Sequence, residues 1–156
     1  MDDNLREFIF STRDELILFH LLNDEEVGHT IPYLELVPYR AGSVLFSEGD
    51  PGGFIAFILS GVIEVKKQTD YAGKQMILGT LTRGSFIGET SLIDPLMPRA
   101  ATAVIIKDAK LAILKNSALE SLMQEYPFIG IKILKGLIRI ITFRLLKALD
   151  KLKMMF

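Results

Sequence analysis

A glycine, a carboxylate and a guanidinium lie close together in the middle third of the chain, in an order that could bind a phosphate and a sugar. Gly88 permits close approach of the backbone, and Thr90 and Ser91 are small enough to expose backbone N–H groups at a helical turn, where anions are favoured. Arg99 offers a planar fork for two phosphate oxygens, and Glu89 offers an acceptor for a sugar hydroxyl. The pattern predicts a site for the phosphate and ribose of a nucleotide.

A purely structural interpretation of the same residues stays open. Glu89 and Arg99 could pair with each other, and Gly88 could serve only as a turn glycine. Against this, a turn needs neither a carboxylate nor a guanidinium, and an arginine that is partly buried without an anion is costly. We therefore expect an anion to complete the site.

These residues must be positioned by a stretch, residues 37–115, whose composition is typical of β-structure. Nine of the twelve glycines lie here and separate short β-rich runs, a spacing that predicts a β-barrel or jelly roll. The runs are 44–46, 54–59, 62–65, 76–81, 101–106 and 111–114.

Two glycine-containing segments between these runs are interpreted as hairpin connections, because glycine readily adopts the positive φ of tight turns. They are Ser60-Gly61 and Tyr71-Ala72-Gly73-Lys74. The phosphate-binding segment, residues 84–103, begins after the fourth run and reaches into the fifth.

Short helices are predicted before the β-rich stretch, in a helical segment at residues 1–36, where apolar residues recur at helical spacing. Asn23 and Glu26 form a capping-box pattern, in which the Asn side chain accepts an early backbone N–H. We expect a small helix to start there and to stop near Gly28.

Two more helices are predicted in residues 116–156, which complete a single domain with the helical segment and the barrel. Asn116 or Ser117 can cap the first of them, which runs through Glu125. Pro127 is well placed in the first turn of the second, a long helix over residues 128–153.

Apolar residues step by three and four along this long helix, which predicts a seam that could pair with a second copy. The seam is Ile131, Leu134, Ile138, Ile141, Leu145, Ala148 and Leu152. Further apolar residues at positions 133, 137, 140 and 149 would let the helix lie on its own barrel and still offer a face to a partner. Charges at 132, 135, 139 and 144 argue against a membrane span.

Composition limits the class of protein. The 156 residues are 49% hydrophobic and 24% charged, which is ordinary for a folded domain, and the absence of Cys excludes disulfides, thiolate metal sites and Cys nucleophiles. The acidic start of the chain is unlike a secretory signal, so we expect a cytoplasmic protein. Residues 129–156 hold seven basic side chains and one acidic one. This basic end is interpreted as a solvated helix stripe rather than as a nucleic-acid or lipid surface.

No pattern in the chain indicates catalysis or a metal site. His20 and His29 lack Cys or a tight acidic cluster around them, and the acidic run at residues 24–26 is better interpreted as a favourable helix start than as a calcium loop. There is no Gly-x-Ser-x-Gly elbow, no catalytic pair of carboxylates and no Walker loop. We expect no enzyme activity and no cofactor.

Two motifs resemble the cyclic nucleotide-binding domain family, the type found in catabolite activator proteins and protein kinase A regulatory subunits. Gly88-Glu89 with Pro98-Arg99-Ala100-Ala101-Thr102 resembles its phosphate-binding cassette, and the run from Gly42 to Val65 resembles its first barrel hairpins. The resemblance covers roughly residues 15–150. It implies a mainly β, α+β fold: a jelly-roll barrel, cupin-like, with N-terminal helices and a long C-terminal helix.

The resemblance also implies roles for the cassette residues. Glu89 would accept the ribose 2′-hydroxyl, and Arg99 would pair with the exocyclic oxygens of the cyclic phosphate. The backbone N–H groups that line the pocket would be those of Gly88, Thr90, Ser91 and Ala100.

The preferred nucleotide and the cover over its base follow from the same resemblance. A hydroxyl residue directly after the cassette arginine often accompanies cGMP, and Ala100 stands there, which favours cAMP. Family members cap the purine with the long C-terminal helix, which places the cap near Phe143-Arg144-Leu145, where this chain departs from the Thr-Ser pair of the catabolite activator protein. Phe143 or Leu145 could cover the ring, or could be core or seam residues.

The resemblance suggests a sensor module that signals through its C-terminal helix to an effector protein or a paired copy. The chain ends at Phe156, just after that helix, so no helix-turn-helix region follows and DNA is not an expected partner. The alternative is a degenerate domain of the same fold that acts as a protein-interaction module without binding nucleotide.

Overall fold

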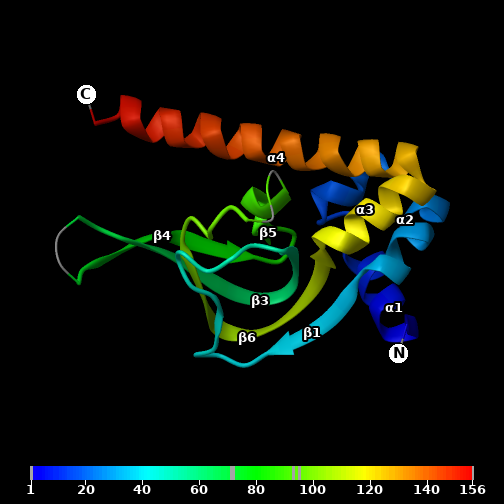
Figure 1. Cartoon of the computed structure of the whole chain (residues 1–156), viewed down its shortest axis with the longest axis horizontal. Helices are drawn as coiled ribbons and strands as arrows, with labels where there is room; N and C mark the ends of the chain where they lie inside the picture. The colour runs from blue at the N-terminus through cyan, green and yellow to red at the C-terminus, as the bar shows by residue number, and fades with distance from the viewer. Residues whose placement is uncertain (1, 71–72, 93, 95, 156) are drawn as a thin grey trace.

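The computed structural model describes residues 2–70, 73–92, 94 and 96–155. It has a curled antiparallel sheet, with the N-terminal helices and α3 gathered at one end and α4 running along one side (Figure 1). In chain order the elements are α1 Asp2–Thr12, η1 Ile17–Leu21, α2 Asp24–Thr30, η2 Ile31–Tyr33, β1 Glu35–Tyr39, β2 Val44–Phe46, β3 Phe54–Gln68, β4 Gln75–Thr82, β5 Phe86–Ile87, η3 Glu89–Leu92, β6 Thr102–Lys115, α3 Asn116–Glu125 and α4 Pro127–Lys153, where η marks a 3₁₀ helix.

Two long strands, β3 and β6, form the backbone of the sheet. The strand order is β1-β6-β3-β4, with β2 also paired to β6 and β5 also paired to β3, and every pairing is antiparallel. β3 and β6 stay paired from Phe54–Lys115 to Lys66–Thr102, with register shifts between Ile58 and Ile63. Such irregularities bend a strand, so each of the two long strands can contribute to both halves of a rolled sheet. The predicted β-rich roll between helical ends is confirmed.

The prediction that Ser60-Gly61 connects two strands of a hairpin is wrong. The runs 54–59 and 62–65 belong to the single strand β3, and the runs 101–106 and 111–114 belong to β6. Gly61 has a φ of 96°, and a Cβ there would lie 2.6 Å from the Asp108 carbonyl oxygen and 2.5 Å from the Ala109 Cβ. Glycine is therefore needed where β3 bends tightly across β6, and its signal in the sequence looks the same as that of a turn.

The second predicted connection does join two strands. Tyr71 and Ala72 lie outside the described residues, but β3 and β4 pair up to Gln68–Gln75, and the Thr69 N–H donates to the Lys74 carbonyl at 3.0 Å. Gly73, with a φ of 76°, adopts a left-handed conformation in the connection.

The sheet separates two hydrophobic cores, and alternate residues of β3 face each of them. Ile55 and Phe57 pack in the core under the helices, whereas Ala56, Ile58 and Ile63 pack in the core inside the roll. This alternation follows from the two-residue period of a strand, and it allows residues 55–59 of β3 to be buried on both sides of the sheet.

The short helix α2 begins with the predicted capping box. The Glu26 N–H donates to Asn23 Oδ1 and the Asn23 N–H donates to Glu26 Oε2, both at 2.9 Å. The helix continues past Gly28 to Thr30, two residues beyond the predicted end. Glu26 also accepts a hydrogen bond from Lys132 Nζ at 2.6 Å, so one carboxylate caps α2 and ties it to α4.

The junction between β6 and α3 differs from its prediction. Lys115 is the N-cap residue and makes no side-chain capping bond, whereas Asn116 is the first residue inside α3 and Ser117 follows it. The Asn116 side chain makes a different hydrogen bond, in which its Nδ2 donates to the Ser91 carbonyl at 2.6 Å. The placement of Pro127 in the first turn of α4 is confirmed.

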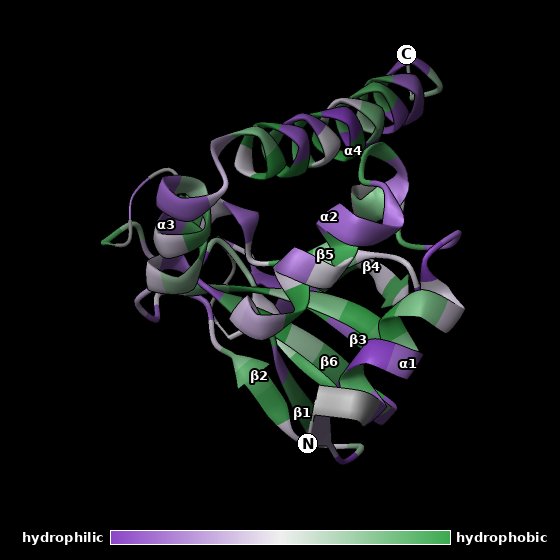
Figure 2. Cartoon of the chain, turned by 90° about the vertical axis from the view of Figure 1, so that its right-hand side faces the viewer, coloured by the Kyte–Doolittle hydropathy of each residue, from purple (hydrophilic) through white to green (hydrophobic). Residues whose placement is uncertain are grey.

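The long helix α4 has one buried face and one exposed apolar face. Ile129, Ile133, Leu137 and Ile140 are buried against the core under the helices. The predicted seam points elsewhere: Leu134 is partly buried at the edge of that core, and the exposed members are Ile131, Ile138, Ile141, Leu145, Ala148 and Leu152. Hydrophobic and hydrophilic residues alternate along the helix (Figure 2). Among the described helices, none is long and apolar enough to cross a membrane.

Candidate functional site

The predicted phosphate-binding segment, residues 84–103, contains β5, the 3₁₀ helix η3 and the start of β6, with a tight turn between β5 and η3. β5 pairs with β3 through Ala56–Ile87, and Gly88, with a φ of 96°, turns the chain into η3. A Cβ on Gly88 would lie 2.7 Å from Arg99 Nη1 and 2.7 Å from the Phe54 carbonyl oxygen. Glycine is therefore required both by the backbone and by the guanidinium beside it.

The loop between β2 and β3 holds the backbone of Arg99. The Arg99 N–H donates to the Asp50 carbonyl at 2.7 Å, and the Gly49 N–H donates to the Arg99 carbonyl at 2.9 Å. Pro51 and Pro98 form an isolated bridge next to these bonds. The turn of η3 and the loop before β3 thus meet at Arg99. Phe54, which follows that loop, is 45 residues away from Arg99 in the sequence.

The Arg99 side chain is almost completely buried, with 2% of its surface exposed. Nη1 donates to the Gly88 carbonyl at 3.2 Å and Nη2 donates to the Phe54 carbonyl at 3.1 Å, whereas Nε is buried with no partner among the described residues. Burial lowers the pKa of Arg99, and the charges of Glu89 and Asp50 partly oppose that shift. The site therefore encloses a cation that two carbonyls satisfy only in part.

Glu89 pairs with a residue of α4 rather than with Arg99. Glu89 Oε1 lies 3.7 Å from Arg144 Nη1, whereas Arg99 forms no ion pair within the described part of the chain. The alternative in which Glu89 and Arg99 satisfy each other is therefore not the observed arrangement. Glu89 keeps a half-buried carboxylate at the start of η3, and its charge acts on the buried Arg99 guanidinium.

Arg144 connects α4 to the cassette at three points. Besides facing Glu89, its Nη2 donates to the Phe86 carbonyl at 2.6 Å, and its guanidinium carbon lies 4.5 Å from the Phe86 ring centroid. Burial lowers the pKa of Arg144, and the charge of Glu89 opposes this shift. From residue 141 to residue 153, only Arg144 is half-buried and the other side chains are exposed.

The two hydroxyl residues of η3 differ in their surroundings. Ser91 is fully buried, its Oγ donates to the Gly88 carbonyl at 2.8 Å, and its carbonyl accepts from Asn116. Thr90 is half-buried. The Ser91–Asn116 bond attaches the cassette to the first turn of α3. Residue types alone do not predict this link, because Asn116 looks like a helix cap.

The remaining predicted site residues lie further out. Ala100 is exposed, and its carbonyl accepts from Lys67 Nζ at 2.7 Å. Phe143 and Leu145 are each 58% exposed, and Lys147 Nζ lies 4.6 Å from the Phe143 ring centroid. The structure brings Gly88, Glu89, Ser91, Arg99 and Arg144 together and leaves Phe143 and Leu145 on the surface.

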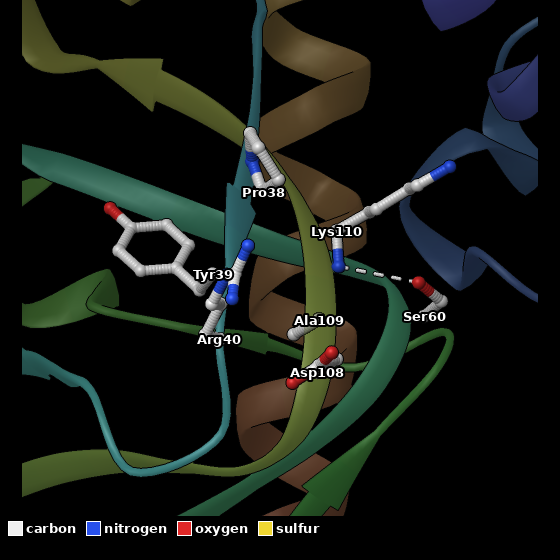
Figure 3. A pocket seen from close by; sticks show the side chains of 7 residues that line it. All are labelled: Pro38, Tyr39, Arg40, Ser60, Asp108, Ala109 and Lys110. Carbon is white, nitrogen blue, oxygen red and sulfur yellow. Dashed lines mark hydrogen bonds between the residues drawn. The ribbon is translucent and has the colours of Figure 1, made fainter.

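A separate hollow, lined by the end of β1 and by residues of β3 and β6, gives no comparable convergence of groups. In Figure 3 the Lys110 amino group points away from Asp108 and Arg40, and the Lys110 N–H donates to Ser60 Oγ at 3.2 Å. Asp108 Oδ1 already accepts from the Ala41 N–H at 2.8 Å. The lining residues are Pro38, Tyr39, Arg40, Ser60, Asp108, Ala109 and Lys110.

Comparisons with known proteins agree with this geometry. The family model for the cyclic nucleotide-binding domain matches residues 36–126. The cyclic AMP receptor protein of Thermus thermophilus is 31% identical over 113 residues, which are 72% of this chain and 51% of that protein. A CRP-like cAMP-activated global transcriptional regulator of Mycobacterium tuberculosis is 28% identical over 122 residues, 78% of this chain and 54% of the regulator. The chain thus spans about half the length of these relatives.

A solved structure shows that the likeness extends to the whole fold. The cyclic nucleotide-binding domain from Methylobacillus flagellatus superposes with a TM-score of 0.85 at 31% identity, covering 96% of this chain and 83% of that one. The predicted fold, a jelly-roll barrel with N-terminal helices and a long C-terminal helix, is confirmed.

Proposed function

The chain belongs to the cyclic nucleotide-binding domain family, and on that premise we propose that it is a sensor module that binds cAMP in preference to cGMP and responds through α4. The role is regulatory, with no cofactor, and the output passes to an effector protein or to a second copy of the chain.

One observation carries the proposal: Arg99 is a buried cation whose Nε has no hydrogen-bond partner in the part of the chain that the structure describes. Buried polar groups nearly always find a hydrogen-bond partner, and an unpaired donor on a charged group is especially costly. The exocyclic oxygens of a cyclic phosphate would supply both the missing acceptor and the missing negative charge. Gly88 supports this assignment, because it leaves room for the guanidinium at the turn.

The ribose is assigned to Glu89, which lies at the start of η3 and whose charge acts on Arg99. A carboxylate accepts hydrogen bonds only, so it suits the 2′-hydroxyl of a ribose and would repel a second phosphate. In the present arrangement Arg144 lies against the same carboxylate. A bound ribose would therefore share Glu89 with Arg144 or displace it.

Two observations favour cAMP over cGMP. Ala100, directly after Arg99, has a methyl group where a hydroxyl residue could bond the guanine amino group. Two of the relatives are named for cyclic AMP. The base remains assigned to α4 near residues 143–145, where Phe143 and Leu145 would have to turn inward to cover it.

Transmission to α4 is assigned to Arg144, because this side chain joins the cassette to the half of α4 that is otherwise exposed. A ligand shifts a conformational equilibrium only by its differential affinity for the two arrangements. A nucleotide that changes the partners of Glu89 also changes the interaction between Glu89 and Arg144. It thereby changes how firmly the last three turns of α4 pack against the cassette.

A second copy of the chain is the proposed receiver of that movement. Exposed apolar residues recur at heptad spacing on the outer face of α4, namely Ile131, Ile138, Ile141, Leu145 and Leu152. Such a seam is stabilised when two helices pack knobs into holes. The competing interpretation, an interaction module without nucleotide binding, uses the same seam but leaves the cassette inert.

The test is isothermal titration of the purified protein with cAMP and then with cGMP, with thermal unfolding in parallel. Saturable binding with cAMP favoured, and a rise in Tm on binding, support the sensor. If neither nucleotide gives binding heat or raises Tm, the sensor proposal is refuted and the interaction module is favoured.

The role of α4 has a test of its own, hydrogen exchange with and without saturating cAMP. We expect the exchange of residues 141–153 to change on binding in the wild-type protein and to stay unchanged in Arg144→Met, which keeps the stem but removes the charge. Equal changes in both proteins would exclude Arg144 as the connection.

A further inference from the structure

We infer that Phe46 and Phe54, which together we call the aromatic corner, position Arg99 by stabilising its guanidinium without neutralising it. The inference rests on the proposed function and goes beyond it, because it assigns a role in anion binding to two residues that would not touch the ligand's charge themselves. Neither phenylalanine belongs to the cassette in sequence.

The geometry of the corner is defined by three distances. The Arg99 guanidinium carbon lies 4.2 Å from the Phe46 ring centroid and 4.5 Å from the Phe54 ring centroid, and the two centroids are 6.2 Å apart. These distances describe a nearly right-angled triangle, so the rings cover two adjacent sides of the cation. Aromatic faces attract a cation but accept no conventional hydrogen bond from it in the guanidinium plane. The Nε donor therefore stays available.

The electrostatic consequence is seen by comparison with other arginines of the chain. Three of them lie against carboxylates: Arg13 against Asp24, Arg83 against Glu15 and Arg144 against Glu89. Arg99 is more buried than these, yet within the described residues it has two carbonyl acceptors, two ring faces and no paired carboxylate. A directly paired carboxylate would compete with an anionic ligand, whereas carbonyls and rings hold the cation without pairing its charge, which Glu89 and Asp50 offset only in part.

The corner is built by the same loop that fixes the Arg99 backbone. Phe46 is the last residue of β2 and Phe54 the first residue of β3, and the loop between them holds the Arg99 N–H and carbonyl through Asp50 and Gly49. Phe54 acts twice, since its carbonyl accepts from Arg99 Nη2 while its ring covers the guanidinium. Backbone and side chain of Arg99 are thus fixed together, which lowers the ordering cost when an anion binds.

The first measurement is the affinity for cAMP of Phe54→Leu and Phe54→Tyr. Phe54 is half-buried, so leucine can fill most of its space while removing the ring face. We expect Phe54→Leu to weaken binding about tenfold and Phe54→Tyr to stay within about twofold of wild type, because tyrosine restores the ring. The matched control is Phe10→Leu, which removes another half-buried phenylalanine with an arginine over its ring, 5.3 Å away, in α1. The control should leave the affinity within about twofold.

Equal affinity of wild type and Phe54→Leu, or equal losses for the leucine and tyrosine variants, would overturn the role of the ring. If the wild-type protein binds neither cAMP nor cGMP, the proposed function fails, and the corner's part in ligand binding fails with it. The two failures can be distinguished, because the role of the ring is refuted in a protein that binds nucleotide, whereas the proposed function is refuted in a protein that does not.

A second measurement examines the corner in the ligand-free protein. Thermal unfolding is compared for wild type, Phe54→Leu, Arg99→Leu and the double variant. If the ring stabilises the guanidinium, Phe54→Leu lowers Tm by less in the Arg99→Leu background than in the wild type, since its partner is already absent. Additive shifts in Tm would show that ring and guanidinium do not interact, and would overturn the inference whatever the affinities are.

Discussion

Replacing Arg99 with leucine separates the binding role of this residue from a structural one. In the ligand-free protein the substitution has opposing effects. It removes a buried charge whose Nε has no partner among the described residues, which is favourable, but it takes one donor away from each of the carbonyls of Gly88 and Phe54, which keep hydrogen bonds from Ser91 Oγ. Because the two effects oppose each other and each is at most about 1–3 kcal/mol, we expect only a small net change in stability.

The effect on nucleotide binding is much larger. Hydrogen bonds to a charged group contribute about 1.5–3 kcal/mol each, and a guanidinium can form two with the exocyclic oxygens of a phosphate. Loss of both corresponds to roughly 3–6 kcal/mol, or an affinity about 10² to 10⁴ times weaker. At a cAMP concentration of about 100 times the wild-type Kd, the wild-type protein gains about 2.7 kcal/mol and its Tm rises by roughly 5–10 °C. The variant at the same concentration gains at most about 0.4 kcal/mol, so its Tm should rise by no more than about 2 °C.

The assay is thermal unfolding of both proteins over a series of cAMP concentrations. Arg83→Leu serves as the control, because it removes an arginine of the same charge that pairs with Glu15 on the surface and is not part of the site. A ligand-dependent rise in Tm that survives in Arg99→Leu would refute the assignment of the phosphate to this residue. A loss of the rise in Arg83→Leu as well would show that net charge, rather than the site, governs binding.

Four further substitutions test other parts of the structure. Gly88→Ala should lower stability by about 1–3 kcal/mol in urea unfolding and abolish nucleotide binding, because of its positive φ and the 2.7 Å approach of the guanidinium. Glu89→Ala should weaken cAMP binding and make cAMP and 2′-deoxy-cAMP bind equally, whereas a retained preference for cAMP would move the ribose elsewhere. Ile138→Lys, at a seam residue that is 62% exposed, should convert dimers to monomers in sedimentation without lowering Tm of the monomer. The hydrogen bond from Lys132 and, to a smaller extent, the one from the Asn23 N–H lower the pKa of Glu26 in the folded protein. The stabilisation from these bonds is therefore present above pH 4.5 and is lost as the pH falls through the pKa that Glu26 has in the folded protein. Glu26→Gln should remove this part of the pH dependence of the free energy of unfolding.

The fold was largely predictable because its signals are local. Glycines punctuate the β-rich stretch, the capping box at Asn23 is formed, and Pro127 opens the long helix as expected. The error at Ser60-Gly61 has a physical reason: glycine permits both a hairpin turn and a bend within a continuous strand, and only the pairing of β3 with β6 distinguishes them. That pairing joins residues far apart in sequence.

The site was predictable to the extent that its residues lie in one segment. Gly88, Glu89 and Arg99 carry recognisable chemistry within twelve positions of one another, and the structure does bring them together. The contacts of Arg144 could not be derived in the same way, because residues 143–145 all point in different directions from a helix and only tertiary packing selects one. Phe54 gave no signal, since a phenylalanine at the start of a strand resembles any core residue.

The pairing of β3 with β6 has a consequence for the order of events in folding. Residues 69–101, which include β4, the turn at Gly88 and Arg99, lie between these two strands and are enclosed as a loop when the strands meet. Closing such loops is slow and entropically costly, so we expect the sheet to nucleate before the site forms. Glu89 and Arg144 meet only after α4 has docked as well. If the site is not formed in the folding transition state, the nucleotide cannot bind to that state. The stabilisation by the nucleotide should therefore appear as slower unfolding, with the refolding rate unchanged.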